Sequence, residues 1–269
     1  MQFGIVSTAL GPVDLPEAFA LAARAGAEGV EIFYYNRDAA KWLDEETHPD
    51  WLKKLQAEHS VKVPSLCLGV LGNDAPLMGD EDQRKRGIRY IRRAIDVAIE
   101  VGADVLLLPF FGKNAIELES ELIKAGEELA ELVEPAEQAG IVLAIESQLN
   151  VSQQRFLLDH LGRTPNVKIY VDTGNDLARK RDPATGIRDL GGGDIAQVHF
   201  KDVRMVEGQP PDFNVALGEG DVDFRAVAQA LRAVGYDGWC VLEAPGGKDP
   251  LATAKQNFAF ARAAFTPTP

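Results

Sequence analysis

Eight short apolar runs recur along the chain, and most of them are separated by segments with a helical pattern. The runs are rich in β-branched residues and lie at 3–8, 29–35, 63–69, 104–111, 141–147, 167–174, 195–202 and 239–245. Segments between them, such as 16–26, 88–102 and 224–235, carry apolar residues every three or four positions, which is typical of helices with one buried face. Strands that alternate with helices pair in parallel, and near-continuous apolar strands are buried on both faces.

Several of the helical segments end at a glycine shortly before the next apolar run. Glycine tolerates the left-handed conformation that ends a helix, and it stands at 26, 102, 140 and 235. The repetition predicts successive βα units, and eight of them match a closed (β/α)8 TIM barrel. A doubly wound open sheet is the alternative. Residues 175–193 have little helical periodicity, so we expect only a short helix there.

The chain has 269 residues and no composition shift that would mark a linker, so we expect one domain over 1–265 and a flexible tail at 266–269. The formal net charge of −13 repels polyanions, which argues against nucleic acid and an acidic membrane as partners. The N-terminus lacks a secretory signal pattern, and no apolar stretch reaches membrane-spanning length. We therefore expect a soluble cytoplasmic protein, and the sequence leaves a homo-oligomer open.

Four consecutive apolar runs end in a residue that can bind a metal. These residues are Glu146, Asp172, His199 and Glu243. In a barrel, the C-terminal ends of the strands share one face, and three carboxylates gathered there need a compensating cation. Carboxylates with one imidazole suit one divalent ion, Mn²⁺ or Mg²⁺ before Co²⁺ or Zn²⁺. The alternative for each acid is a helix N-cap or an ion pair in a loop.

These four strand ends, together with GVEIF at 29–33 and HFKD at 199–202, resemble the xylose isomerase-like TIM barrel superfamily. The sequence is most similar to its sugar or sugar-phosphate isomerase and epimerase family, and in particular to ketose 3-epimerases. The resemblance implies that Glu146 and Glu243 are both metal ligands and the catalytic acid/base pair. It implies that Asp172 and His199 only hold the metal.

The same resemblance and the loop sequences point to three residues for binding substrate. Asn175 stands where these epimerases commonly have a histidine, three residues after the metal aspartate. Arg204 is the nearest counterpart of an arginine that contacts substrate in them. Lys248 lies in PGGKDP after the eighth run, where barrels often bind phosphate.

Two other features of the strand ends are ambiguous in the sequence. Lys201 and Asp202 are adjacent, so we interpret them as an ion pair that supports the strand end, with a catalytic lysine as the less favoured alternative. Glu31 lies within the second run, and it could either face the site or play an outward-facing structural role.

The predicted partner is a small carbohydrate, and the predicted activity is a divalent-metal-dependent isomerase or epimerase that transfers a proton through an enediolate. The resemblance leaves an inosose dehydratase-type lyase and a hydroxypyruvate isomerase as alternative enzymes. A non-catalytic sugar-binding barrel is the alternative outside enzymes.

Overall fold

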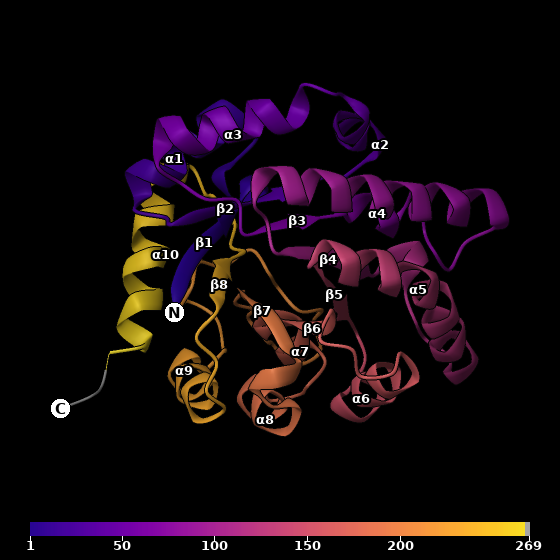
Figure 1. Ribbon diagram of the computed structural model, residues 1–269. Helices are drawn as coiled ribbons and strands as arrows, with labels where there is room; N and C mark the ends of the chain where they lie inside the picture. The colour runs from indigo at the N-terminus through magenta and orange to yellow at the C-terminus, as the bar shows by residue number, and fades with distance from the viewer. Residues whose placement is uncertain (267–269) are drawn as a thin grey trace. The chain divides into compact units, whose positions relative to one another are not determined.

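The computed structural model describes residues 1–266, and all eight predicted strands form in it (Figure 1). The strands are β1 (Gln2–Val6), β2 (Gly29–Phe33), β3 (Ser65–Cys67), β4 (Val105–Phe110), β5 (Val142–Ser147), β6 (Val167–Asp172), β7 (Ile195–Phe200) and β8 (Trp239–Leu242). They are hydrogen-bonded in chain order, and β8 pairs in parallel with β1. The protein is thus a closed eight-stranded parallel barrel, which confirms the predicted TIM barrel and excludes the open sheet.

Helices follow the strands in the alternating order that the sequence predicts. They are α1 (Leu15–Ala25), α2 (Arg37–Ala40), α3 (His48–His59), α4 (Glu81–Val101), α5 (Glu119–Ala139), α6 (Val151–His160), α7 (Thr173–Ala178), α8 (Pro183–Leu190), α9 (Phe224–Ala233) and α10 (Pro250–Ala264). Gly26 ends α1 at φ 85° and Gly102 ends α4 at φ 75°. Both are left-handed, as the βα repeat requires.

The segment between β6 and β7 forms two short helices where we predict one. Asp172, the last residue of β6, accepts a hydrogen bond from the backbone of Asn175 and so caps α7. Asp182 caps α8 in the same way, and Pro183 occupies the first turn of α8. Local capping therefore starts both helices, although each helix is too short to show a clear repeat of apolar residues in the sequence.

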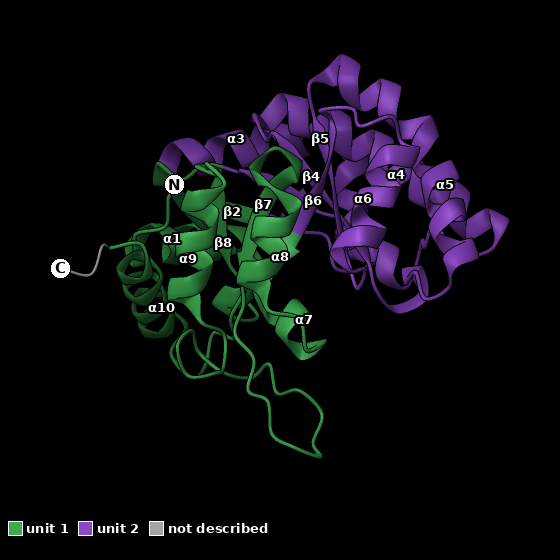
Figure 2. Cartoon of the chain, turned by 90° about the horizontal axis from the view of Figure 1, so that it is seen from below, with its two compact units in different colours: residues 1–31, 59–62, 171–269 green, residues 32–58, 63–170 purple. Residues whose placement is uncertain are grey.

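Two compact units make up the chain (Figure 2). One comprises residues 1–31, 59–62 and those from 171 to the C-terminus, and within it α1 contacts α10 and α8 contacts α9. The other comprises residues 32–58 and 63–170, and within it α4 contacts α5 and β4 pairs with β5. Three of the boundaries fall inside β2, α3 and β6, so these three are not linkers.

The predicted tail at 266–269 lies outside the described residues except for Thr266, so the domain end at residue 265 stays a prediction. Among the described residues, every helix is too short or too polar to cross a membrane.

Candidate functional site

His199 lies near the end of β7, and its imidazole is buried with an exposed fraction of 3%. Its Nε2 atom is 2.9 Å from Oε1 of Glu31, a fully buried residue of β2. A carboxylate at this place accepts a hydrogen bond from the Nε2–H group and thereby leaves Nδ1 as the nitrogen that can bind a metal. Glu31 is thus a partner of His199, which resolves the ambiguity in the sequence.

The other ring nitrogen of His199 faces two carboxylates. Nδ1 lies 3.1 Å from Oε2 of Glu243 and 3.9 Å from Oδ2 of Asp172. Glu243 directly follows β8, and its backbone amide donates to the carbonyl of Phe200 on β7. Parallel pairing of β7 with β8 therefore brings the glutamate to the histidine.

Asp172 is held in place by the helix that it starts. Its Oδ1 atom accepts a hydrogen bond of 2.8 Å from the Asn175 amide, while Oδ2 faces His199. The helix N-cap is the alternative role that we predict for this acid, and the structure shows the cap, while the second carboxylate oxygen faces His199.

Lys201 brings a positive charge to the same carboxylates. Its Nζ atom is 3.0 Å from Oε1 of Glu243 and 3.6 Å from Oδ2 of Asp172. Burial would raise the pKa of Glu243, but the charges of Lys201 and His199 outweigh it and hold that pKa well below its usual value. Glu243 is therefore ionised, and the 33% exposure of its side chain also favours the charged form.

The predicted ion pair between Lys201 and Asp202 is wrong. Asp202 is buried, and its carboxylate accepts hydrogen bonds from the backbone amides of Val203, Gly218, Gly220 and Val222. Residues adjacent in extended chain point to opposite sides, so Lys201 can reach Glu243 while Asp202 faces the loop after β7. Asp202 therefore organises this loop.

The four predicted metal ligands come together. Glu146, Asp172, His199 and Glu243 each offer one ligand atom within 4.8 Å of the others, and the first three are buried. Three carboxylates and one imidazole form a donor set that fits a divalent ion, with the oxygen majority suiting a hard one. These residues could hold a metal.

The three predicted substrate residues differ in their surroundings. Asn175 is next to the cluster, because its backbone amide donates a hydrogen bond to the carboxylate of Asp172. Arg204 is exposed, and its guanidinium donates to the carbonyl of Glu219 at 2.9 Å. Lys248 is exposed in the loop after β8. Their roles in binding substrate stay predictions.

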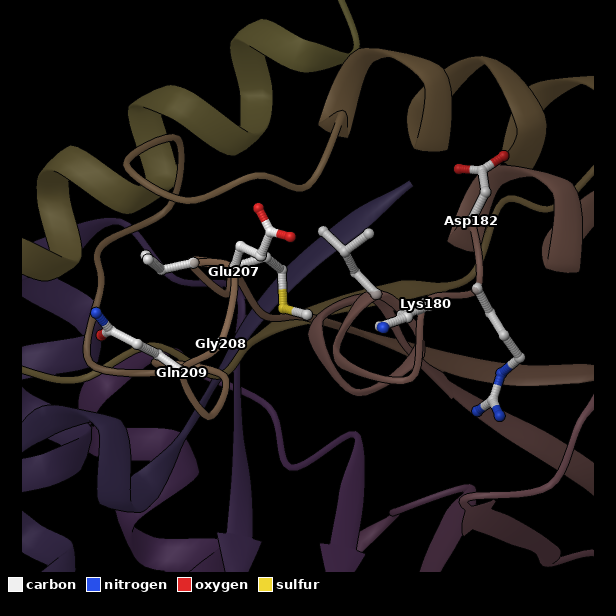
Figure 3. Close-up of a pocket in the computed structure, with 9 residues that line it drawn as sticks. Lys180, Asp182, Glu207, Gly208 and Gln209 are labelled. Carbon is white, nitrogen blue, oxygen red and sulfur yellow. The ribbon is translucent and has the colours of Figure 1, made fainter.

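A cavity of about 600 Å³ lies between the segments that follow β6 and β7 (Figure 3). Lys180 comes from one segment, and Glu207, Gly208 and Gln209 come from the other. Arg181 also lines the cavity, but its charge is paired with Asp176 at 2.9 Å. The volume suits a small ligand, and the lining charges are of both signs.

From the sequence alone we did not predict that Glu31 orients His199. We also did not predict that the ammonium group of Lys201 lies beside the clustered carboxylates. One signal was available for Glu31, since it is the one ionisable residue in the apolar run GVEIF. A carboxylate in a buried strand needs a hydrogen-bonded or positively charged partner. A histidine is one such partner, and the chain has four histidines.

Residues 19–264 match the family described as the xylose isomerase-like TIM barrel. The chain belongs to this family. It is 30% identical over 252 residues to the L-ribulose-5-phosphate 3-epimerase UlaE of Escherichia coli (strain SMS-3-5 / SECEC), an alignment that covers 88% of this chain and 84% of that protein.

Solved structures share the fold across nearly the whole chain. The structure of an L-ribulose 3-epimerase superposes with a TM-score of 0.80 at 20% identity, covering 98% of this chain and 94% of that chain. The IOLI protein, whose crystal structure holds a zinc atom, superposes with a TM-score of 0.75 at 18% identity, covering 98% and 96%. At these identities the likeness shows the fold alone.

Proposed function

We propose that this protein is a divalent-metal-dependent epimerase or isomerase of ketoses or ketose phosphates. The proposal rests on the orientation of the His199 imidazole, whose Nε2 contacts Glu31 while Nδ1 faces Glu243 and Asp172. An imidazole oriented by a carboxylate behind it is a common arrangement of metal sites. The similarity to a ribulose-5-phosphate epimerase supports a sugar as the substrate.

Glu146, Asp172, His199 and Glu243 would hold the ion. A bound divalent cation polarises a carbonyl oxygen and lowers the pKa of the neighbouring C–H group. Asp172 and His199 have the holding role alone, because Asp172 also caps α7 and His199 is fixed by Glu31. Glu31 orients the imidazole and keeps its proton on Nε2.

Glu146 and Glu243 exchange protons with the substrate in this proposal. One glutamate removes the proton from the carbon beside the carbonyl, which leaves an enediolate, and the other returns a proton to the opposite face. The carbon is then inverted, giving an epimer. Return of the proton to the neighbouring carbon would give aldose–ketose isomerisation instead.

The cavity between the segments after β6 and β7 is lined by none of the four proposed metal ligands, so we assign it no part of the substrate. Lys180 and Arg181 bring positive charge to its lining and Asp182 and Glu207 bring negative charge, so neither sign is in excess there. A phosphate would instead bind at the loop that carries Lys248. Arg204 and Asn175 would contact the substrate's hydroxyl groups.

Product analysis tests the proposal. Mn²⁺-loaded protein and chelator-treated protein are incubated with a panel of ketoses, ketose phosphates, hydroxypyruvate and inosose, and the products are separated by chromatography. We expect metal-dependent conversion of a ketose or ketose phosphate to its epimer or aldose. A dehydrated inosose would make the protein a lyase, and binding of sugars without conversion would make it a sugar-binding barrel. Lys248→Met should slow a phosphorylated substrate selectively.

A further inference from the structure

Thr173 and Gly174 hold the backbone of Lys201 in place and leave space for its side chain. The hydroxyl of Thr173 accepts a hydrogen bond from the Lys201 amide at 3.0 Å and donates to the Lys201 carbonyl at 2.7 Å. These two bonds fix the lysine backbone. A side chain on Gly174 would place its Cβ atom 3.0 Å from Cγ of Lys201, so the glycine leaves room for the lysine stem.

The fixed backbone directs the ammonium group to two of the proposed ligands. Nζ is 3.0 Å from Glu243 and 3.6 Å from Asp172, and 19% of the side chain is exposed. Both carboxylates would be engaged by a divalent ion. A monovalent and a divalent cation that share two carboxylates repel each other strongly at separations of a few ångströms, because the site is partly shielded from water.

We propose that Lys201 is a positioning residue that competes with the metal ion for Glu243 and Asp172, and that its ammonium withdraws from them when the ion binds. The proposal rests on the metal site of the proposed function. In the absence of the ion, Lys201 keeps the clustered carboxylates compensated. Its presence weakens the affinity for the ion and so keeps metal binding reversible.

The ring of Phe213 can bind the ammonium group of Lys201 after the ion has displaced it from the carboxylates. Nζ is already 5.2 Å from the centroid of this ring, within the range of a cation–π interaction. The side chain of Lys201 can therefore shift its contact from the carboxylates to the ring while its backbone stays bound to Thr173.

Calorimetric titration with Mn²⁺ at one fixed pH tests the competition. Lys201→Met keeps the length of the stem and removes the charge, and Lys255→Met removes a charge from an exposed position on α10 as the matched control. We expect Lys201→Met to bind Mn²⁺ about tenfold more tightly than the unaltered protein, the size of effect that one nearby unit charge can have in a screened site. Lys255→Met should bind as the unaltered protein does. Equal or weaker binding by Lys201→Met would overturn the proposal.

A double-mutant cycle with Phe213→Leu tests where the ammonium goes. The contact at 5.2 Å exists before the ion binds, so loss of the ring affects Mn²⁺ binding only through the closer contact of the metal-bound form, and we expect about a twofold weakening in the unaltered background. In the Lys201→Met background, the same change should have no effect. An equal effect in both backgrounds would exclude Phe213 as the second contact of Lys201.

Chemical labelling of the unaltered protein gives an answer even if Lys201→Met does not fold. Limiting acetic anhydride is applied with and without Mn²⁺, and mass spectrometry compares Lys201 with Lys255. Labelling of Lys201 should rise severalfold on Mn²⁺ loading, because its amine leaves the ion pairs. Unchanged or reduced labelling in protein shown to bind Mn²⁺ would refute the competition. Failure of the unaltered protein to bind Mn²⁺ at all would instead refute the proposed metal site.

Discussion

Replacement of Glu31 by glutamine removes the charge behind the proposed metal ligand while preserving the shape of the side chain. The carboxylate is fully buried and accepts the Nε2–H bond of His199 at 2.9 Å. The glutamine oxygen can still accept this bond, but it polarises the imidazole less, so Nδ1 becomes a weaker ligand. Partners behind a metal-bound histidine are typically worth about 10-fold to 100-fold in affinity, or about 1.4 to 2.7 kcal/mol.

Mn²⁺ titration of the chelator-treated protein measures this effect. We expect Glu31→Gln to weaken binding by about tenfold and Glu31→Ala by about 100-fold, because alanine also loses the orientation of the ring. Glu28→Gln is the control, since Glu28 precedes β2 and its carboxylate accepts a hydrogen bond from the backbone amide of Phe3 and lies 3.9 Å from the guanidinium of Arg262. If Glu31→Gln folds normally and binds Mn²⁺ as tightly as the control, His199 does not depend on Glu31 and the assignment of Nδ1 as the ligand atom fails.

Four further predictions concern other parts of the structure. Glu146→Gln and Glu243→Gln should each lower kcat by up to about 10⁴-fold with a smaller loss of Mn²⁺ affinity, and full activity with metal bound would remove that glutamate from proton transfer. Asp202→Asn should lower the free energy of unfolding by about 2 to 4 kcal/mol in denaturant titrations, since an amide cannot accept all the backbone bonds of the carboxylate. Burial lowers the pKa of His48 from 6.5 to about 4, so the unfolded chain binds a proton that the folded chain does not. Stability should therefore fall by about 3 kcal/mol from pH 7 to pH 4, and His48→Phe should abolish that part of the pH dependence. Arg204→Ala should raise KM more than it lowers kcat, and unchanged kinetics would return this arginine to a role within its loop.

The fold was predictable because its signals are local and repeated. Each strand is a short apolar run, and glycines such as Gly26 and Gly102 end helices in the left-handed conformation that few other residues adopt. The helices between β6 and β7 were harder to predict, because α7 has six residues and α8 has eight. Their starting points depend on the caps Asp172 and Asp182 more than on an apolar period.

The proposed ligands were predictable for a topological reason. Residues at the C-terminal ends of parallel strands gather on one face of a barrel, so Asp172 and His199 could be placed together from their positions alone. The partners of these ligands could not be predicted in this way. Glu31 lies within its strand, and a run buried on both faces gives no alternation that tells which side a residue takes.

Lys201 and Asp202, which follow Phe200 at the end of β7, show that adjacency in the sequence does not establish an ion pair. Lys201 and Asp202 have opposite charges, which suggests a pair. The extended backbone turns them apart, so the lysine joins Glu243 and the aspartate binds the amides of the loop. Side-chain direction in irregular segments depends on the surrounding loop, and no local pattern in the sequence encodes it.

In the proposed mechanism, clustered glutamates on a metal site move a proton at the carbon beside a substrate's carbonyl. NMR in D₂O tests it most directly, with Mn²⁺-loaded or Mg²⁺-loaded protein and a panel of ketoses and ketose phosphates, the diamagnetic Mg²⁺ form being used for recording spectra. We predict that one substrate acquires deuterium at that carbon, and that chelation of the metal stops the exchange. The absence of exchange in every substrate, with the metal site shown to be filled, would rule out proton transfer by these glutamates.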